Sequence, residues 1–142
     1  MKRIPSIATA MTPFPYSIAA DARIHDAVEM MKEHGIHHLP VMRGHDLIGL
    51  LWHRDVRMAQ QLAAANDTLT VEDLCSGEPY IVELSERLDL VVLEMANRRS
   101  GAAMVTRHGK LAGILTTTDV CRLLGETLRD GIEPPDDDGD VA

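Results

Sequence analysis

The chain has 142 residues, of which 45% are apolar and only 3% aromatic, and its formal net charge is −8. This length suits one domain or two small halves that share an aliphatic core. The scarcity of aromatic side chains argues against a stacking platform for single-stranded nucleic acid, and the negative charge argues against the basic footprint of a nucleic-acid-binding protein.

The ends of the chain and its cysteines indicate the cellular setting. Residues 130–142 contribute six net negative charges, so residues 1–129 carry −2, and we expect residues 130–142 to be a disordered, solubilising acidic tail. Two cysteines are too few for a disulfide framework. No apolar run reaches the roughly 18 residues that span a bilayer, and no apolar signal segment follows the N-terminus. We therefore expect a cytoplasmic protein with neither a membrane nor a nucleic-acid partner.

An internal repeat at an offset of 64 residues organises the chain. Residues 7–56 align with residues 71–120 without a gap, and twelve of these 50 pairs are identical. The repeat predicts a first unit over residues 1–66, a second over residues 67–129, and the tail. Units of this size bury their sheets more readily against each other than alone.

The sequence pattern of each unit predicts the same elements in the same order: a strand, a helix, two strands and a helix. In the first unit we expect these over residues 16–18, 24–34, 39–42, 47–51 and from about Asp55 to 64. In the second unit we expect them over residues 80–82, 88–98, 103–106, 111–115 and from about Asp119 to 128. The predicted fold class is α/β, with two pseudo-symmetric β-α-β-β-α repeats packed through their sheets.

The motifs within the repeats resemble the cystathionine beta-synthase (CBS) domain. They are Met11-Thr12-Pro13, His38-Leu39-Pro40-Val41, the stretch from Gly49 to Asp55, and the stretch from Gly113 to Val120. The resemblance covers about residues 5–128. Two such domains in tandem resemble a Bateman module, which implies a regulatory unit that binds adenosine derivatives in clefts between its halves. It also implies a homodimer in which the helices of two modules pack face to face.

Thr116 and Asp119 are the candidate ribose-binding residues. They are three residues apart at a strand-to-helix junction, where a carboxylate and a hydroxyl could hydrogen bond to a 2′,3′-diol. The same residue types at this place are also good helix caps, so capping is the alternative. The family resemblance favours the ribose role.

The first repeat differs at the equivalent position, where Trp52 replaces Thr116 while Asp55 matches Asp119. A ribose site at Asp55 is therefore in doubt. Trp52 could plug that cleft, pack on a partner subunit, or simply belong to the core.

Histidines gather in the first repeat. By the resemblance, His37, His38, His53 and Arg54 are phosphate ligands for a nucleotide whose ribose rests on Asp119. The second repeat has Gly101 and Ala102 where the first has His37 and His38, so we expect one good nucleotide site. Metal binding by the histidine cluster that also includes His34 is an alternative. His25 and His45 are expected to be surface residues.

Adenine is expected to contact apolar surface and backbone groups. By the resemblance, the candidates lie on two strands of the second repeat: Tyr80, Ile81, Val82, Ala102, Ala103 and Met104. Ordinary core packing is the alternative for all of them.

The residues and the resemblance together predict a regulatory protein, not an enzyme. The sequence contains no glycine-rich phosphate loop, nucleophile elbow or metalloprotease helix. We expect a stand-alone sensor that binds AMP, ADP or ATP, forms a homodimer, and signals to an effector protein in trans. The alternatives are a dimerisation module without a ligand and a metal sensor.

Overall fold

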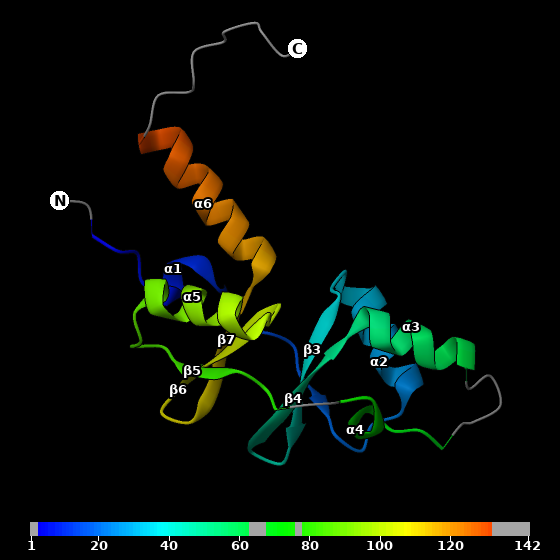
Figure 1. Cartoon of the computed structure of the whole chain (residues 1–142). Coiled ribbons are helices and arrows are strands. Elements are labelled where there is room, and N and C mark those ends of the chain that lie inside the picture. Colours follow the sequence, from blue (N-terminus) through cyan, green and yellow to red (C-terminus); the bar gives the residue numbers. More distant parts are fainter. Residues whose placement is uncertain (1–2, 63–67, 76–77, 132–142) are drawn as a thin grey trace, which may run out of the picture.

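The computed structural model of the chain (Figure 1) describes residues 3–62, 68–75 and 78–131. Its helices and strands follow one another in this order: α1 (Ile7–Ala10), β1 (Thr12–Pro13), β2 (Ile18–Ala19), α2 (Ile24–His34), β3 (His38–Arg43), β4 (Asp46–Trp52), α3 (His53–Leu62), α4 (Val71–Leu74), β5 (Ile81–Glu83), α5 (Leu88–Arg98), β6 (Ala102–Arg107), β7 (Lys110–Thr116) and α6 (Thr117–Gly131).

The strands form two sheets with matching topology. One sheet has the order β2-β3-β4 and the other the order β1-β7-β6-β5. In each sheet a short strand runs parallel to the first strand of an antiparallel hairpin. Both hairpins shift register at the equivalent place, after Val41 and after Val105. The predicted α/β class with two pseudo-symmetric repeats is confirmed.

Helices α2 and α5 have the bounds that the sequence predicts, because their apolar residues recur at helical spacing. The buried residues Ala27 and Met31 of α2 pack into the core of the first unit. This helix ends at Gly35, whose φ of 63° is left-handed and whose N–H bonds to the carbonyl of Met31. The position equivalent to Gly35, after α5, is occupied by Arg99, with a φ of 52°.

The two units exchange segments, which the sequence did not predict. β1 pairs with β7, and Ile7 of α1 is fully buried in the core of the second unit. In return, Val71 of α4 is fully buried in the core of the first unit, with its N–H bonded to the carbonyl of Ala22. Arg43 of β3 also forms an ion pair with Glu72 of α4. Each unit, as divided between residues 66 and 67 of the sequence, thus contributes a segment to the core or sheet of the other.

Several predicted bounds need correction. The closing helices begin at His53 and Thr117, two residues earlier than expected. At the start of α6, Asp119 accepts a hydrogen bond from the N–H of Thr116 and thereby caps the helix. Helix α6 continues through Gly131, so Asp130 is helical and does not begin the tail. The rest of the predicted tail lies outside the described residues. The short elements α1, β1 and α4 were not expected.

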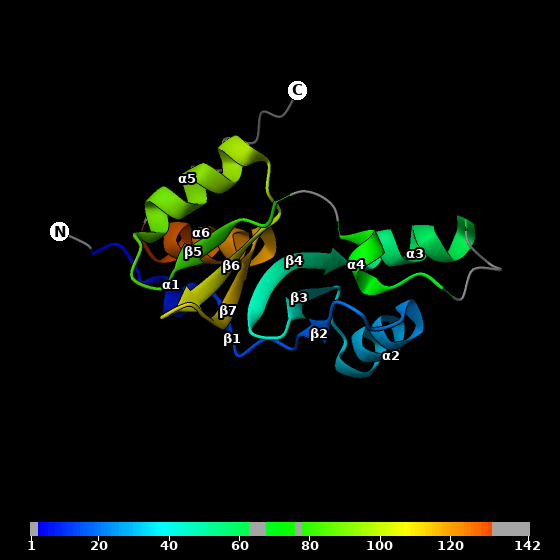
Figure 2. The same cartoon turned by 90° about the horizontal axis from the view of Figure 1, so that it is seen from below.

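The two sheets lie side by side between their helices (Figure 2). Met104 and Ile114 are almost fully buried, yet they belong to neither of the helix-facing core clusters. Since side chains alternate along a strand, these two residues point away from the helices of their own unit. None of the described helices is both long and apolar enough to cross a bilayer.

Candidate functional site

A cavity of about 670 Å³ lies where the two units meet. Residues from both repeats line it: Thr12, Gly35, Ile36, His37, His38, Trp52, Arg54, Arg99, Gly101, Thr116, Thr117, Thr118 and Asp119. Its volume falls within the range of about 300–1,000 Å³ that is common for small-molecule sites. The cavity thus brings together the predicted ribose residues and three of the four predicted phosphate residues.

Asp119 forms one wall of this cavity and is only 9% exposed. Its Oδ2 accepts hydrogen bonds from the N–H and the hydroxyl of Thr116, at 2.8 and 2.9 Å. Its Oδ1 lies 3.5 Å from a guanidinium nitrogen of Arg122, which is a long contact. The predicted capping role is therefore present, and it uses one carboxylate oxygen. Oδ1 keeps capacity to accept a hydrogen bond from a ligand hydroxyl.

The hydroxyl of Thr116 is committed within the same cap. It donates to Asp119 Oδ2 and accepts from the Asp119 N–H at 3.3 Å. A hydroxyl has one proton, so in this arrangement Thr116 can offer a ligand only an acceptor lone pair. Asp119 is thus the stronger candidate for accepting hydrogen bonds from a diol, and Thr116 orients its carboxylate.

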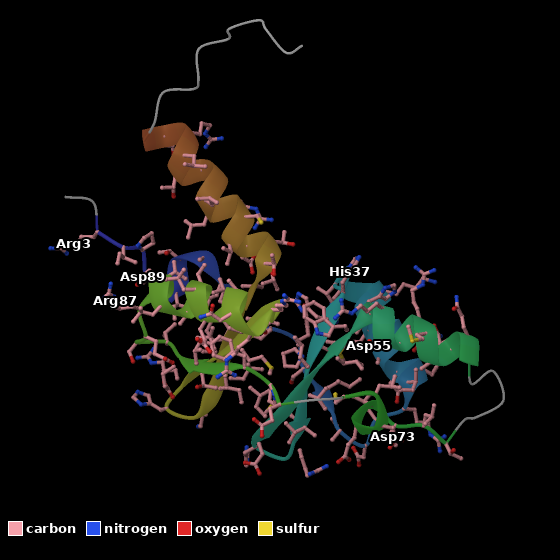
Figure 3. The ribbon with its side chains drawn as sticks, viewed as in Figure 1. Arg3, His37, Asp55, Asp73, Arg87 and Asp89 are labelled. Atoms are coloured by element: carbon pink, nitrogen blue, oxygen red, sulfur yellow. The ribbon has the colours of Figure 1, made fainter. Side chains whose placement is uncertain are left out.

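The predicted phosphate residues lie at two junctions of the first unit: His37 and His38 at the start of β3, and His53 and Arg54 at the start of α3. His37 and His38 line the cavity, whereas His53 does not. The N–H of His53 donates to the carbonyl of His37 at 2.8 Å, and their rings lie 5.4 Å apart. In Figure 3, His37 lies beside the start of α3, the helix that carries Asp55. His53 therefore supports His37 and is not itself part of the lining.

Burial affects the protonation of His38. It lowers the pKa of His38 below its usual value, because a half-buried imidazole is harder to charge. The hydrogen bond to its own backbone and the Asp119 carboxylate act in the opposite direction, while His37 adds to the lowering. The Asp119 carboxylate therefore partly offsets the effect of burial on the pKa of His38.

Trp52 lies in the same cavity. Its ring meets the His38 ring edge to face at 5.7 Å, and the guanidinium carbon of Arg54 lies 5.5 Å from the ring centroid. Two indole atoms also approach Gly101 of the other unit. Trp52 thus lies at the contact between the two units of one chain, a place that the alternatives in the sequence analysis did not include.

Sequence reasoning missed several of the lining residues, among them Arg99 and Thr12. Arg99 has a left-handed backbone, which is uncommon outside glycine, at the position where the other repeat has Gly35. That mismatch between the repeats was the available signal, since it indicates a side chain kept despite backbone strain. Thr12 lines the cavity because β1 crosses to the second sheet.

The six residues predicted to contact adenine do not line the cavity. Val82, Ala103 and Met104 are buried core residues, and Ala102 is 5% exposed. Ile81 is exposed on a short edge strand, and the ring of Tyr80 lies under the guanidinium of Arg98 at 4.5 Å. For the three candidates on β6 the physical reason is burial on both faces of the strand, since every residue from Ala102 to Thr106 is buried.

The described part of the chain contains no group of three or more His, Cys, Asp or Glu side chains arranged to hold a metal ion. Among the histidines named for the metal alternative, His34 stacks on Tyr16 at 3.6 Å, while His37 and His38 line the cavity. The surface residue His25 contacts Glu29, with both side chains largely exposed.

The fold and this cavity define a tandem repeat module. The family model for the CBS domain matches residues 6–61 and 71–126, so the chain belongs to the CBS domain family. The sequence resemblance is therefore confirmed.

Similar proteins include both single modules and larger enzymes. A Vibrio cholerae protein given the acetoin-utilization name AcuB has a TM-score of 0.75 at 21% identity, and the match covers 93% of this chain and 100% of that one. CBSX2, solved in complex with AMP, has a TM-score of 0.69 at 25% identity, covering 85% and 96%. The L-aspartate semialdehyde sulfurtransferase of Methanocaldococcus jannaschii is 26% identical over 78% of this chain and 21% of its own length. This chain spans only 21% to 24% of the curated relatives it matches.

Proposed function

We propose that this protein is a regulatory sensor that binds an adenosine nucleotide, AMP, ADP or ATP, in the cavity between its two repeats and signals to a partner protein in trans. One observation carries the proposal: a single cavity combines the carboxylate of Asp119 on one repeat with a group of basic side chains from the other. CBSX2, a relative at 25% identity, was solved with AMP. Such a protein has a regulatory role and not a catalytic one.

The distribution of charge along the cavity fits a ligand with one neutral, hydroxylated part and one anionic part. Asp119 accepts hydrogen bonds and repels phosphate, so it suits the ribose. Arg54 and Arg99 are exposed cations at the rim, and in the described part of the chain neither pairs with a carboxylate. They suit the phosphates, with His37 and His38 beside them.

The base requires an apolar surface near the ribose wall. Ile36 supplies a half-buried aliphatic side chain in the lining. The exposed residues Gly35 and Thr12 line the same cavity and offer polar backbone and hydroxyl groups. We therefore place adenine against Ile36 in this proposal, in preference to the strands named from the sequence. Hydrogen bonds to backbone groups would then distinguish adenine from other bases.

Thermal unfolding with a ligand panel tests the proposal. The panel contains adenosine, AMP, ADP, ATP, NAD, S-adenosylmethionine and zinc. A ligand at 100 times its dissociation constant adds about 2.7 kcal/mol to the free energy of unfolding, which is easily measured as a rise in Tm. Stabilisation by one or more adenine nucleotides is the expected result. Stabilisation by zinc alone would favour the metal sensor, and no response from any of these ligands would favour the dimerisation module.

The affinity for ATP is expected to rise as the pH falls below about 6.5, because the phosphates attract the charged form of the His38 imidazole, whose pKa burial holds below its usual value of about 6.5. Adenosine binding should not change over that range. Isothermal titration at several pH values measures both affinities. The terminal phosphate of the ligand titrates near pH 6 as well, so the His38→Gln variant is the control. A pH dependence of equal size in that variant would remove His38 from this role.

The unliganded protein should show the opposite trend in stability. The pKa of His38 is lowered in the folded state, so folding disfavours its protonation. Stability is therefore fully present above the unfolded pKa of about 6.5 and declines as the pH falls below it. Bound ATP should reduce that decline, because the phosphates stabilise the charged imidazole.

Dimerisation has its own supporting observation. Helices α5 and α6 expose four leucines, each 46% to 62% accessible: Leu90, Leu93, Leu124 and Leu128. We propose that this α5–α6 face packs on a second copy of the chain, because exposed apolar clusters of this kind are commonly interfaces. Light scattering at micromolar concentration should give twice 15.6 kDa, and Leu93→Lys with Leu128→Lys should give monomers. A monomeric wild type at these concentrations would contradict the homodimer.

A further inference from the structure

We propose that Trp52 is a positioning residue that confers specificity for phosphorylated ligands: its indole holds Arg54 and His38 at the phosphate end of the cavity. The inference rests on the proposed nucleotide site and goes beyond it by naming the residue that organises the basic wall. Trp52 itself need not touch the ligand for this role.

The contacts of the indole on its own unit carry the first step. Trp52 is the last residue of β4 and pairs in register with His38 of β3. Their rings meet edge to face, with 5.7 Å between centroids and 83° between planes. The guanidinium carbon of Arg54 lies 5.5 Å from the indole centroid, within cation–π range. One side chain thus contacts two of the basic groups that line the cavity.

Arg54 is held by an aromatic ring and not by a carboxylate. Among the described residues Arg54 has no ion pair with a carboxylate, and its guanidinium lies over the indole of Trp52. An ion pair would have to break before a phosphate could bind. A cation–π contact occupies the face of the guanidinium and leaves its N–H edge free for a bidentate phosphate interaction. Trp52 therefore orders Arg54 without neutralising it.

The benzene ring of the indole meets the second unit. A Cβ atom on Gly101 would lie 3.2 Å from Trp52 Cη2 and 3.3 Å from Cζ2, so a side chain there would require the indole to shift by a few tenths of an ångström. The carbonyl of Gly101 accepts hydrogen bonds from the N–H and the hydroxyl of Thr117, at 3.0 and 3.1 Å. Thr117 begins the helix that carries Asp119. The indole thus lies between Gly101, beside the start of the helix that carries Asp119, and the basic side chains of His38 and Arg54.

The repeat itself indicates that this is a specialised arrangement. The positions equivalent to Trp52, His38 and Arg54 are Thr116, Ala102 and Thr118. These small side chains cannot form a stack of an imidazole, an indole and a guanidinium. One copy of the repeat therefore has a small polar clamp at the place where the other has an aromatic and basic cluster.

The test is isothermal titration of wild type, Trp52→Phe and Trp52→Leu with adenosine, ATP and inorganic tripolyphosphate. Trp52→Leu should weaken ATP and tripolyphosphate about three- to tenfold, since the cation–π support is lost, and change adenosine by less than about twofold. Trp52→Phe keeps a ring of weaker quadrupole and should fall between wild type and Trp52→Leu. Phenylalanine also serves as the variant for measurement if leucine does not fold.

A double-mutant cycle with Arg54→Gln separates positioning from a structural role. If Trp52 acts through Arg54, Trp52→Leu should cost much less ATP affinity in the Arg54→Gln background than in the wild type. Equal losses for adenosine and ATP, or full additivity of the two substitutions, would overturn the positioning role while leaving the nucleotide site intact. Failure of the wild type to bind any of the three ligands would instead overturn the proposed function and this inference together.

Discussion

Replacing Asp119 with asparagine is expected to lower the affinity for AMP and ATP by about ten- to hundredfold. The substitution removes the charged acceptor at the ribose wall, and hydrogen bonds to charged groups contribute about 1.5–3 kcal/mol. Asparagine keeps one side-chain oxygen that can still accept the hydrogen bond of the Thr116 N–H, so the start of α6 should stay capped. Isothermal titration measures the affinity, and thermal unfolding reports the fold.

The chain supplies two matched controls for this variant. Asp55 is the equivalent residue in the other repeat and does not line the described cavity, so Asp55→Asn should change the affinity by less than about threefold. Asp73 accepts a hydrogen bond from the N–H of Thr70 at 2.8 Å, the same capping contact at the same distance, and does not line the cavity. Asp73→Asn should therefore resemble Asp119→Asn in stability and wild type in binding. Equal losses of affinity for Asp55→Asn and Asp119→Asn would contradict a single site anchored at Asp119.

Replacing Gly113 with alanine is expected to destabilise the protein by about 1–3 kcal/mol, the usual cost of overpacking a well-packed site. Gly113 of β7 lies opposite Pro13 of β1. A Cβ atom there would lie 2.9 Å from the carbonyl oxygen of Thr12, and it would also overlap the side chain of Met11. Backbone cannot move aside as a side-chain end can, so β1 would have to shift or detach. Urea unfolding measures the loss.

Gly49 is the control, because it occupies the equivalent position in the other repeat. A Cβ atom on Gly49 would meet only ordinary contacts, with Cys75 Cβ and Sγ at 3.4 Å. Gly49→Ala should therefore cost clearly less than Gly113→Ala. Similar costs for the two substitutions would contradict the crossing of β1 onto the second sheet.

Local patterns in the sequence were sufficient to predict the repeating elements. Helices α2 and α5 have the predicted bounds because apolar spacing specifies which helix face is buried, independently of what covers it. The hairpins were predicted to within a residue or two because alternating apolar residues and a tight polar turn act over short distances. Thr116 and Asp119 could be predicted as a pair for a similar reason, because a helix cap involves residues only three positions apart in the sequence.

Tertiary structure alone decided the segments whose partners are distant in sequence. A two-residue strand such as β1 has no periodicity, and its partner β7 lies about a hundred residues further along the chain. The contribution of Thr12 to the cavity depends on that pairing, and the contribution of Arg99 depends on a left-handed residue that local pattern does not predict. The adenine candidates lie outside the cavity lining, and an apolar residue gives the same local pattern whether it faces a ligand or the core.

Trp52 shows where sequence and structure each have their limit. The sequence by itself determined that the two repeats differ at this position, an indole against the hydroxyl of Thr116, and that the histidines gather in the same repeat as Trp52. Whether the indole filled its own cleft, met another subunit or lay in the core depended on which surface came to lie beside it. Only the packing of the two units places it against Gly101, because the space for the ring is made by a glycine that lies 49 positions away in the sequence and comes close through the contact between the two units.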